Sequence, residues 1–262
     1  MADEASVRRP EPEVRAIGAS DIVDAFAAGL RDFRAAPLYG LFFGGIYAVG
    51  GMVIVLTAYY LELSYLSYPL AVGFVLIGPF VAVGLYEVSR RRESGAPLGW
   101  RGVLGVIVEQ RKREMGWMAF VTVFILVIWM YQVRILIAVF FGLKVPATVG
   151  GFLAALVSTP EGWLFLLVGH AVGALLALVL FSLTVVSFPL LLDRELDFIT
   201  AMITSVRSVT ANPAPMIGWA AIVVILLIVA MAPLFAGLFV VLPILGHTTW
   251  HLYRKLVAPA EG

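Results

Sequence analysis

The chain has 262 residues, of which 61% are hydrophobic and 13% charged, and its mean hydropathy is +0.99. Soluble domains carry about 25% charged and about 45–50% apolar residues, so a soluble fold of this size could not bury so much apolar surface. The net charge of +1 argues against a nucleic-acid-binding protein, and the absence of cysteine excludes disulfides, iron–sulfur clusters, thiolate zinc sites and a cysteine nucleophile.

The N-terminal segment differs in composition from the rest of the chain. Residues 1–18 are charged and contain prolines, without the apolar core of a cleaved secretory signal. We predict a disordered cytoplasmic tail there, a single transmembrane domain over residues 19–257 and a short C-terminal tail at residues 258–262.

Six apolar stretches are candidates for membrane-spanning helices, each of which needs about 20 mostly apolar residues. As a single helix, the last apolar stretch, residues 215–250, would be about 54 Å long, which is too long for one crossing. Pro233 lies where a tight reversal would fall, so we predict two short spans there, with one long kinked helix as the alternative. The predicted spans are 38–61, 68–86, 117–141, 163–190, 215–231 and 234–251.

The positions of the basic residues orient these helices. Of the 18 lysines and arginines, only Lys144 falls in a predicted outer loop and only Arg134 within a span. Basic loops are retained in the cytoplasm, so both termini are predicted to lie there. The outer loops are too short for a periplasmic catalytic domain.

An amphipathic segment precedes each pair of spans, which predicts an internal threefold repeat of interfacial helix plus transmembrane hairpin. The repeats would cover about residues 19–92, 98–194 and 195–257. The first and third units match further, because a proline follows an arginine by six residues in each, at Pro37 and Pro213. The alternative is that charges simply flank every span. The apolar faces are Ile22, Phe26, Leu30 and Phe33, then Trp100, Val103, Leu104, Ile107 and Val108, then Leu196, Ile199, Ile203 and Val206.

Small residues and prolines in the spans indicate how the helices pack and bend. Small residues spaced by four allow helix backbones to approach closely. The second helix of every hairpin carries a proline, which predicts a kink. The predicted packing residues are Gly40, Gly44 and Ala48 in the first span and Gly169, Gly173 and Ala177 in the fourth, and the predicted kinks are at Pro79, Pro189 and Pro243.

Polar residues inside the spans are the only candidates for chemistry. Arg134, with Gln132 nearby, is either a buried or anion-binding group or an arginine that reaches the headgroups. His170 is predicted at a similar depth, either in a polar pocket with Arg134 or as a hydrogen-bonded core residue. His247 and His251 share a helix face at a spacing that can hold a metal or haem, although no carboxylate or thiolate adjoins them in the sequence. We therefore predict no catalytic residue and no metal site.

Five segments within about residues 20–257 carry a family resemblance. They are Asp32-Phe33 with Pro37-Leu38-Tyr39-Gly40-Leu41, Gly78-Pro79, Phe188-Pro189-Leu190-Leu191-Leu192-Asp193, Ala201-Met202-Ile203-Thr204-Ser205, and Leu242-Pro243 through Tyr253-Arg254. Together they resemble the DUF2189 family of bacterial integral membrane proteins, some of which are labelled as a cytochrome c oxidase subunit. The resemblance implies a place in the inner membrane of a bacterium, beside the aerobic respiratory chain.

The residues restrict what that label can mean here. A catalytic oxidase subunit needs more histidines than the three present, and a dinuclear copper subunit needs cysteines. The sequence therefore predicts an all-α polytopic membrane protein that is not an enzyme. We expect an accessory subunit or assembly partner of a respiratory oxidase, in contact with lipids and without a cofactor of its own. The alternative is a small-solute channel or transporter.

Overall fold

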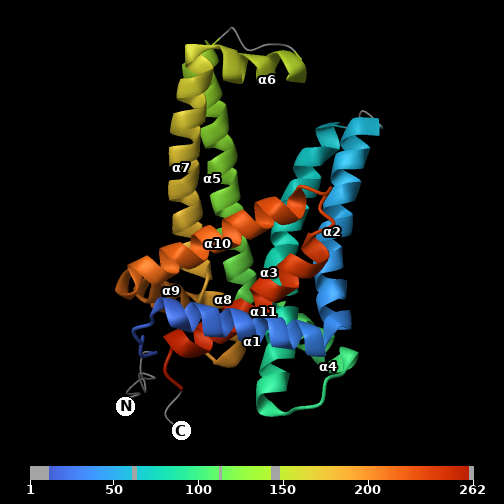
Figure 1. Ribbon diagram of the computed structural model, residues 1–262, viewed down its shortest axis with the longest axis vertical. Helices are drawn as coiled ribbons and strands as arrows, with labels where there is room; N and C mark the ends of the chain where they lie inside the picture. Colours follow the sequence, from blue (N-terminus) through green and yellow to red (C-terminus); the bar gives the residue numbers. More distant parts are fainter. Residues whose placement is uncertain (1–11, 61–63, 112–113, 143–147, 260–262) are drawn as a thin grey trace, which may run out of the picture.

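The computed structural model describes residues 12–60, 64–111, 114–142 and 148–259, which fold almost entirely into helices (Figure 1). Long helices stand roughly upright in the view of Figure 1, most of the others cross them lower down, and one short helix lies across the top. The helices are α1 (Ala19–Ala35), α2 (Pro37–Tyr60), α3 (Ser64–Ser94), α4 (Trp100–Arg111), α5 (Met115–Phe141), α6 (Val149–Ser158), α7 (Pro160–Thr184), α8 (Ser187–Asp193), α9 (Phe198–Ala211), α10 (Pro213–Met231) and α11 (Leu238–Leu256).

The three predicted amphipathic segments are all helical, as α1, α4 and α9. The residues that follow the last turns of α1 and α9, Ala36 and Asn212, have nearly the same backbone angles, φ −135° and ψ 53° against φ −128° and ψ 55°. Each precedes a proline that begins the next helix, and a proline disfavours the helical conformation in the residue before it. The joint between α1 and α2 therefore has the same backbone conformation as the joint between α9 and α10, as expected from Pro37 and Pro213.

Four stretches among the described residues are long and apolar enough to cross a membrane: Pro37–Thr57, Met115–Phe141, Pro160–Asp193 and Pro213–Met231. The predicted arrangement of six spans is therefore not confirmed. For the predicted span at 68–86, the side chains of residues 64–77 and 79, Pro79 included, lie outside the described part of the chain.

Helix α11 differs from the predicted sixth span. Residues 215–251 form two helices, α10 and α11, that reverse direction between Met231 and Leu238, rather than one kinked helix. The first half of α11 is apolar, but its second half carries histidines and ends in Arg254 and Lys255. This second half packs against α1 and α3, so it is surrounded by protein.

The break between α7 and α8 follows from Pro189. A proline lacks an N–H group and its ring clashes with the carbonyl four residues earlier, which here belongs to Val185. The helix ends at Thr184 and resumes at Ser187, a few residues before the proline itself. The backbone N–H of Val186 donates to Ser205 Oγ of α9 at 3.1 Å, so the break is sealed by a neighbouring helix.

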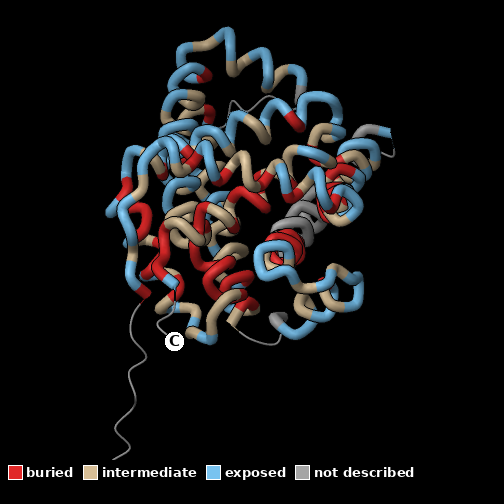
Figure 2. The backbone as a smooth tube through the Cα atoms, turned by 60° about the horizontal axis from the view of Figure 1, so that its bottom comes forward, coloured by how far each residue is buried: buried red, intermediate tan, exposed pale blue. Residues whose placement is uncertain are grey.

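The buried core lies at the base of the molecule (Figure 2). Buried residues are concentrated in the last turns of α3, in α8 and in the second half of α11, whereas the most apolar 18 residues of α5 contain no buried residue. Helix α9 contributes its small polar face to this core, through Thr204, Ser205 and Ser208, and exposes Ile199 and Ile203 of its predicted apolar face.

The two ends of the described chain meet at the same base. Val14 forms an isolated antiparallel bridge with Val257, and the N–H of Arg15 donates to the carbonyl of Leu256 at 2.7 Å. Part of the predicted N-terminal tail is thus bound to the C-terminal end of α11. Residues 1–11 of that tail lie outside the described residues.

Candidate functional site

A group of polar side chains joins three helices inside the base of the molecule. We call it the polar layer, and it comprises Asp32 of α1, Ser89, Arg92 and Glu93 of α3, and His247 and His251 of α11. Asp32 lies at its centre. One carboxylate oxygen accepts a hydrogen bond from Arg92 Nε at 2.8 Å, and the other accepts one from His251 Nε2 at 2.7 Å. Because an ionised carboxylate only accepts hydrogen bonds, His251 must carry a proton on Nε2.

A close helix crossing makes this arrangement possible. Gly29 of α1 packs directly on Thr248 of α11, where an added Cβ would lie 2.6 Å from the backbone nitrogen of Thr248. Only a glycine allows the two backbones to approach this closely. Asp32 and His251 each lie three residues further along their helices, which brings their side chains together at the crossing.

The charge of Asp32 is stabilised by its neighbours. Burial alone would raise the pKa of this carboxyl group, but hydrogen bonds from His251, Arg92 and Ser89 outweigh burial and lower the pKa to about 2. The carboxylate is therefore ionised at neutral pH, and it holds α1 to both α3 and α11.

His247 and Ser89 are the most deeply buried polar groups of the layer. His247 Nδ1 lies 2.8 Å from Ser89 Oγ, the histidine side chain is fully buried, and its Nε2 has no hydrogen-bond partner among the described residues. Burial penalises the charged imidazolium and lowers the pKa of His247 to about 4. The ring is therefore neutral at physiological pH.

Glu93 extends the layer toward its rim. Its carboxylate accepts from Trp250 Nε1 and from Arg254 Nε, both at 3.0 Å. Arg254 also contacts Asp193 at 3.3 Å, and the hydroxyl of Tyr253 donates to that same carboxylate at 2.6 Å. These contacts connect α3, α11 and the end of α8.

The polar layer does not include the predicted candidates Arg134, Gln132 and His170, which lie on α5 and α7. Arg134 is exposed on α5, and Gln132 is partly exposed two residues before it. His170 is exposed on α7, where its Nδ1 lies 2.6 Å from the carbonyl oxygen of Leu166 in its own helix. Among the described residues, no hydrogen bond or ion pair joins Arg134 to His170.

The small residues predicted for packing, apart from Ala177, occupy two helix contacts. In α2, Gly40 faces Phe33 and Pro243, Gly44 faces the backbone of Leu238, and Ala48 is fully buried. In α7, an added Cβ at Gly173 would lie 2.6 Å from the Trp129 ring of α5, Gly169 faces Leu136 of α5 at 4.0 Å, and Ala177 is exposed. Pro243 itself lies within the continuous helix α11 and is buried.

The two C-terminal histidines are held in separate interactions. His251 Nε2 is bound to Asp32 and His247 Nδ1 to Ser89, so these nitrogens do not converge on a common point. In the described part of the chain, no group of three or more His, Asp or Glu side chains is arranged to hold a metal ion. Chemically, the polar layer serves to link helices.

The sequence analysis missed Asp32, Ser89, Arg92 and Glu93 as members of a site. A signal for Asp32 was present, because it continues the buried face of α1 formed by Ile22, Ala25 and Gly29 at helical spacing. A carboxylate on the inner face of an amphipathic helix indicates a buried partner.

The fold and the apolar helices define a polytopic α-helical integral membrane protein. Residues 67–193 match the sequence model of the family described as "Predicted integral membrane protein (DUF2189)", which confirms the resemblance over that range. The range includes Gly78-Pro79 and the segment 188–193, whereas the resembling segments in α1, α9 and α11 lie outside it. No curated protein and no solved structure matches the chain.

Proposed function

We propose that this protein is a non-catalytic component of a larger membrane complex, as an accessory subunit or assembly partner. The observation that carries the proposal is that one group of helices binds internally, whereas another exposes its apolar surface. The ionisable groups of the polar layer bind one another across α1, α3 and α11, so they serve the fold. The hairpin of α5 and α7, in contrast, presents long apolar surfaces that no other described residue covers.

The α5–α7 hairpin is the surface on which we place the partner. Phe120, Phe124, Tyr131 and Ile135 are more than half exposed and recur along one side of α5 at helical spacing. Large aromatic side chains are enriched at protein–protein interfaces. A transmembrane helix of another protein is the occupant that this surface favours over lipid alone.

For the identity of the partner we propose a respiratory cytochrome c oxidase in the bacterial inner membrane, with both termini of this chain in the cytoplasm. The support for this step is the family resemblance together with the small number of histidines and the absence of cysteine, which leave the redox centres to other chains.

Site-specific photo-crosslinking in cells tests the proposal. A photoreactive residue replaces Phe124 on α5. The matched control places it at Val229 on another apolar helix, α10, where Val229 is 62% exposed. We expect protein adducts from position 124, absent at position 229, with oxidase subunits among them by mass spectrometry. Adducts to lipid only at position 124 would contradict the scaffold role, and adducts to other membrane proteins would contradict the oxidase assignment.

A small-solute channel or transporter is the second candidate, favoured by one observation. Arg134 and His170 are exposed polar groups on otherwise apolar spans, where polar side chains commonly belong to a pathway. Flux through proteoliposomes should then fall after Arg134→Ala or His170→Ala. Flux equal to that of the unsubstituted protein in both variants removes this candidate.

A further inference from the structure

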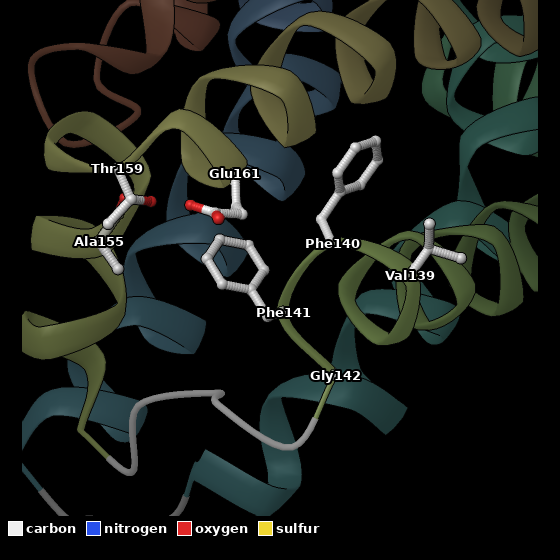
Figure 3. A pocket seen from close by; sticks show the side chains of 7 residues that line it. All are labelled: Val139, Phe140, Phe141, Gly142, Ala155, Thr159 and Glu161. Atoms are coloured by element: carbon white, nitrogen blue, oxygen red, sulfur yellow. The ribbon is translucent and has the colours of Figure 1, made fainter.

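A pocket lies at the end of the α5–α7 hairpin that is remote from the polar layer (Figure 3). It has a volume of about 540 Å³ and is formed by the last turn of α5, the end of α6 and the first turn of α7. Its lining residues are Val139, Phe140, Phe141, Gly142, Ala155, Thr159 and Glu161.

One carboxylate lies beside an aromatic ring in this pocket. Figure 3 shows the Glu161 carboxylate next to the ring of Phe141, whereas the ring of Phe140 points away from it. Glu161 has no hydrogen bond or ion pair to any described residue. Thr159, the other polar side chain of the lining, is already engaged, because its hydroxyl donates to Ala155 and accepts from the N–H of Gly162.

The rings of Phe140 and Phe141 are held in place by neighbouring rings. The centroid of Phe141 lies 5.4 Å from that of Phe152 and 5.6 Å from that of Phe165, and Phe140 also packs on Phe165 at 6.4 Å. A fixed aromatic face attracts a cation through its ring quadrupole, and a carboxylate nearby adds a direct charge. The combination selects a small organic cation over an anion or a neutral solute.

We propose that this pocket binds an ammonium group, either that of a phospholipid headgroup or that of a free amine. Arg134 links the pocket to the first source. It precedes Phe141 by seven residues, or two turns, so it lies on the same face of α5 and about 10 Å nearer the middle of the helix. An arginine there reaches toward the headgroup region along its stem and can bind the phosphate of a lipid whose amine occupies the pocket.

Glu161 also has a role that needs no ligand. It lies in the first turn of α7, where a negative charge interacts favourably with the helix dipole. Glu161→Gln is therefore expected to lower the melting temperature slightly in any lipid. The diagnostic quantity is the change in melting temperature that a ligand produces.

The first arm of the test uses choline as the probe, with the full chain in phosphatidylglycerol nanodiscs, whose headgroups lack an amine. We expect choline to raise the melting temperature of the unsubstituted protein. The variants Glu161→Gln and Phe141→Leu should each need about fivefold more choline for the same rise in melting temperature. A factor of about five corresponds to the loss of one partly exposed ionic or cation–π contact. Glu109→Gln, at an exposed carboxylate on α4, is the matched control and should respond like the unsubstituted protein.

The second arm replaces phosphatidylglycerol with phosphatidylethanolamine and omits choline. A rise in melting temperature that is lost in both Glu161→Gln and Arg134→Gln identifies a lipid headgroup as the ligand. A response to choline alone, unaffected by Arg134→Gln, identifies a free amine. The proposal is overturned if neither probe shifts the melting temperature, or if both shifts persist in Glu161→Gln and Phe141→Leu.

Discussion

The polar layer and the α5–α7 hairpin differ in how their helices are held and in how much of their surface is exposed. The polar layer joins α1, α3 and α11 through hydrogen bonds to the buried carboxylate of Asp32, so each helix there has a fixed position. The hairpin holds together through apolar packing between its two helices, such as Gly173 against Trp129, and leaves most of its surface to lipid or a partner. The comparison teaches that stability should depend on the base of the molecule, and interactions with other molecules on the hairpin.

The largest expected effect comes from removing the centre of the polar layer. Asp32→Ala leaves Arg92 and His251 close together without their carboxylate, and breaking a buried ion pair from one side typically costs about 3 kcal/mol or more. We expect a loss of about that size in the free energy of unfolding, measured by denaturant titration in detergent micelles. The control is Asp24→Ala, because Asp24 is exposed and Lys255 is its one partner among the described residues, and it should cost less than about 0.5 kcal/mol. Equal losses in the two variants would contradict the importance of the layer.

Lowering the pH should destabilise the layer through His247. Its folded pKa of about 4 lies below its ordinary value of 6.5, so the fold favours the neutral ring. The associated stability is fully present above pH 6.5 and is lost as the pH falls from 6.5 toward 4. About 2–3 kcal/mol should be lost between pH 7 and pH 4.5. The contribution of Asp32 persists through this range, because it is lost only below about pH 3.8.

The matching experiment compares unfolding at pH 7 and pH 4.5 in the unsubstituted protein and in His247→Asn. The difference between the two pH values should shrink in the variant, which has no imidazole to protonate. A difference of the same size in both proteins would show that other groups cause the pH dependence.

The helix crossing beneath Asp32 gives the next effect. Gly29→Ala places a methyl group against the backbone of Thr248 and should cost about 2 kcal/mol through overpacking. Gly105→Ala on α4 is the control, because nothing lies within 4 Å of its added Cβ. Alanine is the better helix former, so the control should be neutral or slightly stabilising. Thermal melts of the two variants in the same detergent separate these outcomes.

The smallest effect is expected on the hairpin. Leu167 of α7 is 69% exposed, so Leu167→Ala should change the free energy of unfolding by less than about 0.5 kcal/mol in micelles. A loss as large as that of Gly29→Ala would mean that the hairpin surface is covered within the chain, which would remove the contrast between the two regions.

Much of the helical plan was predictable from local signals. The apolar spacing located α1, α4 and α9, and Pro37 and Pro213 located two corners, because a proline restricts its neighbour whatever the tertiary contacts. Pro189 predicted a disturbance in the fourth span, but the break lies at Val185 and Val186, because the proline acts on the carbonyl four residues earlier.

The polar layer was not predictable in the same way. Asp32 and His251 are 219 residues apart, and Ser89 and His247 are 158 apart, so only the packing of three helices brings them together. The same packing explains the difference at α11. Its apolar first half suggested a span, whereas its polar second half is buried by protein, an environment that hydropathy does not distinguish from lipid.

The bridge between Val14 and Val257 constrains how many times the chain crosses the membrane. Two segments that hydrogen-bond to each other must occupy the same compartment. The chain between them therefore traverses the bilayer an even number of times, so any odd count is ruled out without reference to loop charges. If α11 does not cross, then α3 and the four apolar stretches cannot all cross, unless one more segment makes the return.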